Sequence, residues 1–243
     1  MRLRELSSLL VLTSCLASPA TAAQPIAWGD LVDKAAQHYE DPYQSLSPNQ
    51  LELLISIKQL RERFTSDARD AKGRSTIQQQ LRTNEAKLAA DGIDADWLIS
   101  QRWTVAKRRE RAATAGNKEL DGQVVIIAGF AIPAPADPDG TRVAYLVPER
   151  GMCSHMPPPL SNQMIRLRLK KGWRPDRSHV PVRVRGMLRI APSAHHIFMV
   201  DGRMPMRATF VIEEARVVPI GASTRRPVPA SPDLNLNKIQ QAD

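Results

Sequence analysis

The sequence predicts an α+β fold in which an N-terminal helical region precedes a small OB-like antiparallel β-barrel or sandwich. Two observations lead to this prediction. Apolar residues recur at helical spacing up to about residue 117, and about six short β-rich segments with polar outer faces follow it. We therefore divide the 243-residue chain into four parts. They are a signal peptide (1–22), a helical region (23–117), a β domain (118–219) and a disordered tail (220–243).

Composition excludes several classes of protein. The chain has 34 Lys and Arg against 25 Asp and Glu, a formal net charge of +9, and 42% apolar residues. This apolar fraction is typical of a globular protein and argues against full disorder or a collagen-like repeat. Beyond the N-terminus no apolar run reaches the roughly 18 residues that a membrane helix needs, so we expect no transmembrane span in the mature chain.

The first residues resemble a secretory signal. Arg2 and Arg4 give a basic start, an apolar stretch follows, and Ala20-Thr21-Ala22 has the small-x-small pattern of a cleavage site. This pattern predicts an exported, periplasmic protein. Leu12-Thr13-Ser14-Cys15 also resembles a bacterial lipobox, so the alternative is an outer-membrane lipoprotein acylated on Cys15. After cleavage at the alanine site Cys153 is the single thiol, which excludes an internal disulfide.

Three helices are expected before residue 117, and they would pack as a small antiparallel hairpin or as a three-helix unit. Ser47-Pro48 is a helix start, and the residues after it keep helical spacing. A break at Asp70–Gly73 precedes Ser75, a second N-cap. Asp91-Gly92 ends that helix, and Asp94 caps a third. The third helix ends in a basic run, which is either a solvated face or a contact for anions or lipid headgroups: Lys107, Arg108, Arg109 and Arg111.

The β domain is built from short strands with β-branched or alternating residues. We expect them at Gln123–Phe130, Arg142–Val147, Gln163–Lys170, Val180–Ile190, His196–Val200 and Ala208–Val218. Ala136–Gly140 has the composition of a turn. Gly129 and Gly186 lie inside strand patterns, where glycine is typical of a bulge or a corner. The Pro-rich segment from Gly221 is expected to be disordered or loosely attached.

Candidate chemistry concentrates in the segment Glu149–Gln163, which contains three consecutive prolines. Cys153 and His155 are two residues apart and would project to the same face of an extended loop. A thiolate beside an imidazole could begin a site for zinc or copper as Cu(I). A third ligand would then have to come from His179, from His195 or His196, which we favour, or from a methionine folded nearby.

The same pair has two other interpretations. Cys153 could be a nucleophile and His155 its base, with Asn162 as the orienting group. Alternatively the loop is a rigid packing element in which Cys153 is a small buried hydrophobe. In that case Asn162 and Gln163 hydrogen-bond backbone groups that the prolines leave without partners.

At this loop the sequence resembles a bacterial family of unknown function, domain-of-unknown-function family 3299. The similarity rests on Gly151, Cys153 and His155, with Pro157-Pro158-Pro159 and Asn162-Gln163 after them. Weaker motifs extend it over about residues 119–218: Leu120-Asp121-Gly122, Val124, Gly129-Phe130, Pro133, Leu146-Val147-Pro148, Val182, Val184 and Gly186. The helical region looks like a lineage-specific extension. The resemblance implies an exported protein or lipoprotein of a Gram-negative envelope, serving an ABC-type transporter or metal homeostasis, with no known catalytic residues.

Basic residues occupy the polar positions of two predicted strands: Arg166, Arg168 and Lys170 on one, Arg183 and Arg185 on the other. Exposed together, they could bind an anionic lipid, a lipopolysaccharide phosphate or an acidic protein partner. The alternative is an ordinary solvated face. We expect no nucleic-acid partner, because aromatic residues for base stacking do not alternate with these cations and export separates the protein from nucleic acid.

Three functions therefore compete. The first is a non-enzymatic envelope accessory or binding module, the second a zinc or copper carrier that uses Cys153 and His155, and the third a thiol-dependent enzyme. The chain lacks a Gly-rich phosphate loop, an HExxH motif, paired CxxC motifs and a G-x-S-x-G elbow, which favours the first.

Overall fold

A computed structural model of the chain describes residues 22–66, 71–170, 173, 177–199 and 202–221. The expected signal sequence up to residue 21, with Cys15, lies outside the described residues, as does the expected tail from residue 222. The part that is described combines helices with a six-stranded sheet, so the predicted α+β class is confirmed.

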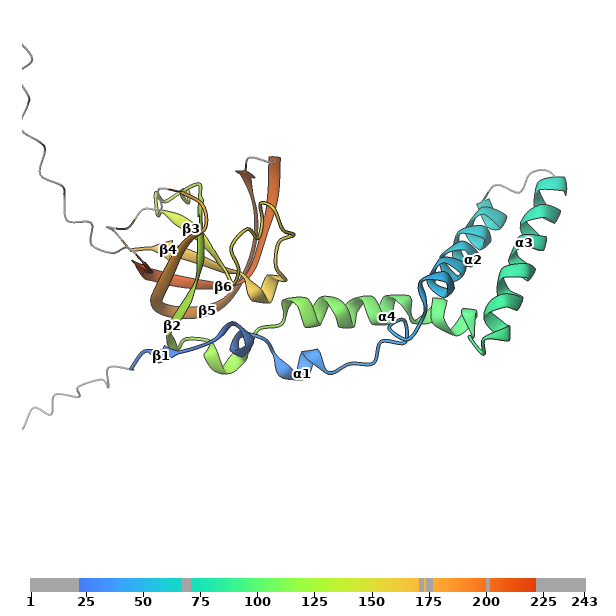
Figure 1. The fold of residues 1–243 in the computed structure, drawn as a ribbon, viewed down its shortest axis with the longest axis horizontal. Coiled ribbons are helices and arrows are strands. Elements are labelled where there is room, and N and C mark those ends of the chain that lie inside the picture. The colour runs from blue at the N-terminus through green and yellow to red at the C-terminus, as the bar shows by residue number, and fades with distance from the viewer. Residues whose placement is uncertain (1–21, 67–70, 171–172, 174–176, 200–201, 222–243) are drawn as a thin grey trace, which may run out of the picture.

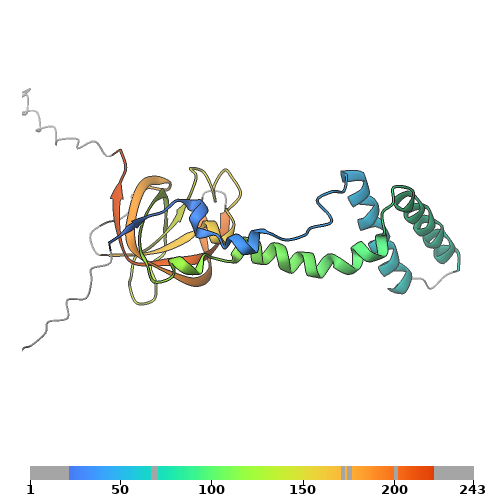
Figure 2. The same cartoon turned by 90° about the horizontal axis from the view of Figure 1, so that it is seen from below.

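The molecule is elongated, with the sheet at one end and a helical hairpin at the other (Figures 1 and 2). Helix α4 connects the two ends. The elements in chain order are β1 (Gln24–Pro25), η1 (Trp28–Leu31), α1 (Lys34–Gln37), α2 (Pro48–Ser66), α3 (Ala71–Ala90), α4 (Ala95–Thr114), η2 (Lys118–Leu120), β2 (Val124–Ala134), β3 (Val143–Val147), η3 (Ser161–Gln163), β4 (Ile165–Leu169), β5 (Val180–Met199) and β6 (Gly202–Pro219).

Local capping signals set two of the three long helices where the sequence predicted them. At the start of α2 the backbone N–H of Ser47 donates to the Gln50 side chain at 2.9 Å, and Ser47 Oγ accepts from Gln50 N at 3.3 Å. Asp94 caps α4 by accepting from Trp97 N at 2.9 Å. The predicted start of α3 at Ser75 is wrong, because the helix already begins at Ala71. A glycine inside a helix costs only about 1 kcal/mol, so Gly73 does not prevent the helix from starting one turn earlier.

The helices α2, α3 and the first turns of α4 share a small apolar core and form a unit that we call the arm. Its buried residues are Leu54, Ile57, Leu88, Ala95 and Leu98. Arg61 of α2 joins all three helices, because it pairs with Glu85 of α3 at 2.7 Å and with Asp96 of α4 at 2.5 Å. The expected three-helix unit is therefore present.

The strands pair in the order β1-β2-β3-β4-β6-β5, and β2 also pairs with β5. Each of the five strands β2 to β6 thus pairs with two others of the five, and β2 also pairs with β1. The expected antiparallel pairing is found in β2–β3, β2–β5, β3–β4 and β5–β6, whereas β4–β6 and β1–β2 are parallel. On β4 the predicted alternation is confirmed: Ile165, Leu167 and Leu169 are buried, and the arginines between them are half-buried.

The N-terminal segment belongs to the packing of the β domain although it precedes the helices in sequence. Strand β1 pairs with β2, and Leu31 is fully buried in the main β core. The other buried residues of this core come mainly from β2 to β6: Leu120, Val125, Ile127, Ala131, Ala144, Leu146, Ile165, Leu167, Leu169, Val180, Val182, Val184, Leu188, Phe210, Ile212 and Ala215.

Strands β5 and β6 are much longer than the sequence predicted. The two expected strands Val180–Ile190 and His196–Val200 are joined in one strand, β5, which runs to Met199. Val200 lies outside the described residues. Its register against β6 shifts between Arg185 and Met187 and again between Ile190 and Ser193. Bulges of this kind bend a strand, and the first confirms the expected irregularity at Gly186. The far half of the β5–β6 hairpin contributes Ile197, Met206 and Ala208 to a second apolar cluster.

Gly129 marks a close approach rather than a bulge. A Cβ at this position would lie 2.7 Å from the backbone oxygen of Val147 and 2.9 Å from the Trp28 ring. We predict that Gly129→Ala lowers the free energy of unfolding by about 1–3 kcal/mol, because a backbone oxygen cannot move aside. Gly29→Ala is the matched control, since nothing lies within 4 Å of its Cβ position. Urea unfolding measures both, and equal effects would contradict the packing described here.

Candidate functional site

The loop that carries Cys153 is a tight turn. Gly151 has a φ of +92°, and its carbonyl oxygen accepts hydrogen bonds from the backbone N–H groups of Ser154, His155 and Met156 at 2.9–3.1 Å. Cys153 has a φ of +65° and donates its own N–H to the Met156 oxygen at 3.0 Å. The expectation that Cys153 and His155 share one face of an extended loop is wrong, because this turn buries Cys153 and leaves His155 exposed.

Cys153 is fully buried in the second apolar cluster. Its neighbours in that cluster come from β2, β3, the start of β4 and the β5–β6 hairpin: Ile132, Val143, Tyr145, Val147, Met164, Ile197, Met206 and Ala208. Burial raises the pKa of the Cys153 thiol to about 11. The thiolate is the reactive form, so a neutral, inaccessible thiol is a poor nucleophile.

The structure does not bring together the four residues expected to bind metal. His155, His195 and His196 are exposed, and the last two lie on the β5–β6 hairpin opposite Met206 and Pro205. Within the described residues no group of three or more His, Cys, Asp or Glu side chains could hold a metal ion. The cluster around Cys153 instead contains sulfur from Met164 and Met206.

Asn162 and Gln163 hold the end of the loop against the rest of the molecule. Asn162 is fully buried, and its Nδ2 donates to the carbonyl oxygens of Ala112 at 2.8 Å and Ala115 at 3.0 Å, at the C-terminal end of α4. Gln163 Nε2 donates to the Trp28 oxygen at 3.0 Å. Both side chains do hydrogen-bond backbone groups, as one interpretation expected. Most of these groups lie at the end of α4 and in the N-terminal segment, and one lies in the loop itself, where Gln163 Nε2 donates to the Asn162 oxygen at 3.1 Å.

The four arginines expected to form an anion site do not share an exposed face. Arg166 pairs with Asp137, and Arg168 pairs with Asp137, Asp139 and Glu213. Their side chains are only 15% and 28% exposed. Arg183 and Arg185 are exposed, but they lie on β5, which is separated from β4 by β6. The turn Ala136–Gly140 supplies two of the carboxylates that neutralise β4, so the expected common face is wrong.

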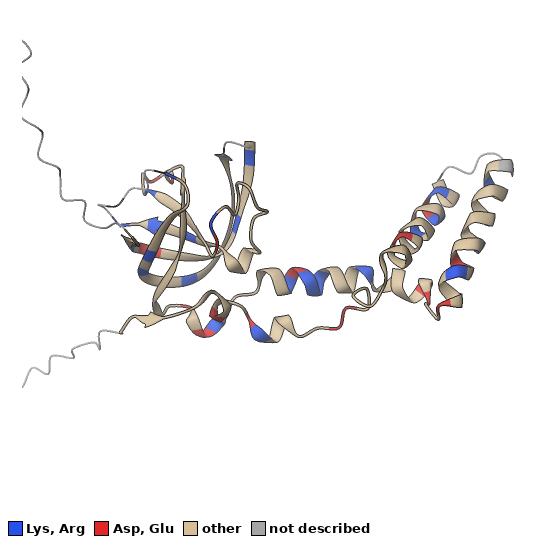
Figure 3. Cartoon of the chain, in the orientation of Figure 1, with Lys and Arg blue, Asp and Glu red and all other residues tan. Residues whose placement is uncertain are grey.

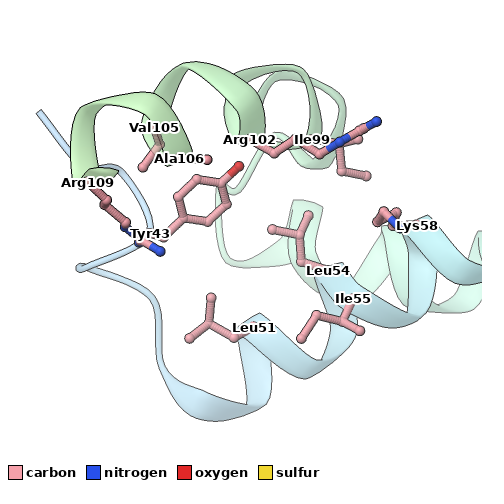
Figure 4. Close-up of a pocket in the computed structure, with 10 residues that line it drawn as sticks. All are labelled: Tyr43, Leu51, Leu54, Ile55, Lys58, Ile99, Arg102, Val105, Ala106 and Arg109. Atoms are coloured by element: carbon pink, nitrogen blue, oxygen red, sulfur yellow. The ribbon is translucent and has the colours of Figure 1, made fainter. Parts of the chain in front are cut away.

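An apolar hollow that sequence reasoning missed lies on the arm, between α2 and α4. It has a volume of about 330 Å³ and is shown in Figure 4. Its lining residues are Tyr43, Leu51, Leu54, Ile55, Lys58, Ile99, Arg102, Val105, Ala106 and Arg109. The wide apolar stripe on α2 could have predicted this hollow from the sequence. One neighbouring helix cannot cover so wide a stripe, and part of it is left exposed. Ile55 remains 54% exposed.

One wall of this hollow is held by a polar cluster. Arg109 binds Asp41 with two hydrogen bonds of 2.7 and 3.0 Å, and its guanidinium lies 5.6 Å from the centre of the Tyr43 ring. The hydrogen bond from Arg109 holds the pKa of Asp41 below its usual value. Tyr43 donates its hydroxyl to the Leu98 oxygen at 2.5 Å, and burial raises its pKa. Tyr43 therefore lies in a fixed position beside α4.

Comparison with known protein families shows to which family the chain belongs. The family model described as "Protein of unknown function (DUF3299)" matches residues 28–211. The chain belongs to the DUF3299 family. Because the match begins at residue 28, the expectation that it is limited to about residues 119–218 is wrong. The helical region is part of the DUF3299 match, not an extension.

A solved member of the DUF3299 family is similar over most of the chain. The crystal structure of a DUF3299 family protein from Pseudomonas aeruginosa PAO1 has 18% sequence identity and a TM-score of 0.40. The alignment covers 82% of this chain and 97% of that one. A comparison with curated proteins found no match. In the part of the chain that the structure describes, no helix is long and apolar enough to cross a membrane.

We predict that the Cys153 thiol is unreactive in the folded protein. In a Cys15→Ser background, a thiol reagent at pH 8 should label Cys153 only after denaturant is added, because the folded thiol is neutral and buried. The folded pKa of about 11 lies above the ordinary value of 9.0. The neutral Cys153 thiol therefore makes its full contribution to the free energy of unfolding below pH 9, and this contribution is lost as the pH rises from 9 to 11. Cys153→Ala should lack this component. Labelling of the native protein at the rate of a free thiol would contradict the prediction.

We also predict that Asn162→Ala destabilises the junction between α4 and the β domain. The substitution removes two buried hydrogen bonds to Ala112 and Ala115, and we expect a loss of about 1–3 kcal/mol in the free energy of unfolding. Gln59→Ala, on the exposed face of α2, is the control and should change it by less than about 0.5 kcal/mol. Urea unfolding measures both, and a neutral Asn162→Ala would show that the junction does not depend on this amide.

Proposed function

We propose that the protein is a non-enzymatic binding module of the bacterial cell envelope. The observation that carries this proposal is the difference between the cysteine loop and the arm. The loop that held the candidate chemistry is a packing element with an inaccessible thiol, whereas the arm presents an open apolar hollow. In this proposal the β domain is the scaffold and the arm is the part that binds.

The strand pairings support an OB-like barrel as that scaffold. Counted from β2, the five strands follow the order 1-2-3-5-4, and the pairing of β2 with β5 joins the first strand to the fourth. This is a Greek-key arrangement that closes on itself. Closure leaves few free strand edges, which suits a rigid support for a projecting arm.

The envelope location in this proposal rests on the N-terminal sequence. The basic start, apolar stretch and small-residue site support export to the periplasm, and the lipobox-like sequence at Cys15 supports an outer-membrane lipoprotein as the alternative. As an accessory of the envelope, the module would serve a protein partner such as a component of an ABC-type transporter. The neutralisation of Arg166 and Arg168 by carboxylates argues against β4 as a binding face for anionic lipid or lipopolysaccharide.

A second function, Cu(I) carriage, has one specific observation in its favour. Met164 and Met206 are fully buried in the same cluster as Cys153, and Met152 packs against that cluster. Thiolate and thioether sulfur are the ligands that Cu(I) prefers, and binding of the metal would replace the thiol proton. Zinc is less suited to this set, because it prefers nitrogen or several thiolates.

Protein purified from detergent-solubilised whole native cells tests the proposal. Intact-mass measurement should show an N-terminus near Ala23, or a lipid-modified Cys15, and elemental analysis should find zinc and copper well below one equivalent. An intact Met1 would contradict the envelope location. One equivalent of copper that is lost in both Cys153→Ala and Met206→Leu would replace the binding module with the carrier. His155→Ala is the matched control, because this side chain is exposed outside the cluster.

A further inference from the structure

The hollow between α2 and α4 continues into a second one and forms a single open trough. The second hollow has a volume of about 420 Å³ and shares Lys58, Ile99 and Arg102 with the first. It adds residues of the last turns of α2, up to Ser66. Since a helix rises 1.5 Å per residue, the trough extends about 22 Å along α2, from Leu51 to Ser66.

The floor of the first hollow is apolar and is only partly covered within the described residues. Ile55 is 54% exposed, and Leu51 and Ile99 are half-buried (Figure 4). The neighbouring helix α3 contributes no residue to the lining of either hollow and instead meets α2 at Ser56, whose hydroxyl accepts a hydrogen bond from Asn84 Nδ2 at 3.1 Å. Exposed apolar surface arranged along a groove is typical of a site for another molecule.

The walls of the trough carry an excess of positive charge, and two of these cations can bind an incoming anion. Arg102, on α4, makes no ion pair within the described residues. Its guanidinium lies 5.3 Å from the centre of the Trp103 ring, and its charge also acts on the Tyr43 hydroxyl. Lys58, on α2, pairs with Glu62 at 3.0 Å. This pair is exposed and lies on one helix, so it is weak and easily exchanged. Figure 3 shows further basic residues along the second half of α4.

From these observations we propose that the trough binds an acidic amphipathic helix of a partner protein. Anchors at positions i, i+3 or i+4, and i+7 span about 10 Å of a helix, which fits within the length of the trough. Carboxylates beside these anchors would pair with Arg102 and Lys58. The inference deepens the proposed function, on which it rests, by naming the class of partner.

Charge complementarity selects this occupant over a second copy of the chain. The chain has a net charge of +9, and α4 itself is basic beyond Arg102, at Lys107, Arg108 and Arg111. Two such arms would repel one another. The Tyr43 and Arg109 side chains at one end of the trough are already fixed, which lowers the entropy cost of binding. Tyrosine and arginine are also the residue types enriched where binding energy concentrates.

The experiment uses the full chain and two synthetic peptides of 16 residues. One peptide places leucines at helical spacing with glutamates between them, and the other has the same composition in an order that breaks the apolar stripe. We expect calorimetry to detect binding of the striped peptide only, weakened by salt. Arg102→Glu and Ile55→Asp should each weaken it at least tenfold. Arg183→Glu, which reverses an exposed charge on the β domain, is the control and should leave affinity within twofold.

Several outcomes would overturn the inference. They are equal binding of both peptides, no binding of either, or affinity that Arg102→Glu and Ile55→Asp leave unchanged in proteins with native circular dichroism. Binding to vesicles of phosphatidylglycerol, lost in Arg102→Glu, without binding of the striped peptide would assign the trough to a lipid surface instead. None of these results changes the copper content measured in the native protein. Copper in the native protein would therefore contradict the binding module without contradicting the helix-binding trough, and a failed peptide experiment would contradict the trough without contradicting the binding module.

Discussion

The buried amide of Asn162 joins the C-terminal end of helix α4 to the β domain. The last carbonyl groups of a helix have no partners within it, and burying them against a domain costs free energy unless a donor is supplied. Here Asn162 supplies two hydrogen bonds, to Ala112 and Ala115, and Thr209 donates its hydroxyl to the Thr114 oxygen at 2.8 Å. The end of α4 is thereby fixed to the β domain. A helix of 20 residues is about 30 Å long, so this junction decides where the arm lies.

The loop before Asn162 shows how residues of chemical interest can serve packing. Cys153 adopts a left-handed backbone conformation that is uncommon for residues other than glycine. The hydrogen bonds that the Gly151 carbonyl oxygen accepts from the loop stabilise this conformation. The side chain then fills the space between β3 and the far half of the β5–β6 hairpin. This arrangement closes a second core on the outside of the sheet. The loop supports the same region of the molecule to which Asn162 and Gln163 attach the arm and the N-terminal segment.

Features governed by neighbouring residues could be predicted from the sequence. Ser47 and Asp94 cap the helices that they precede, and the alternation on β4 places Ile165 and Leu167 inside, because these effects act over a few residues. Features that depend on distant contacts could not be predicted. The pairing of Asp137 and Asp139 with arginines 29 residues away removed a predicted anion site. The burial of Cys153 depends on the β5–β6 hairpin, which lies more than 40 residues further along the chain. The first strand of this hairpin, β5, was predicted as two separate strands.

Our account places the binding surface on an arm that the β domain holds in a fixed position, and an electron-spin distance measurement tests this most directly. Spin labels would be attached at Arg82→Cys on α3 and Arg183→Cys on β5 in a Cys15→Ser background, where the buried Cys153 stays unlabelled. The account predicts one narrow distance distribution for this protein and a broad one after Asn162→Ala. A broad distribution that is the same with and without Asn162 would contradict it.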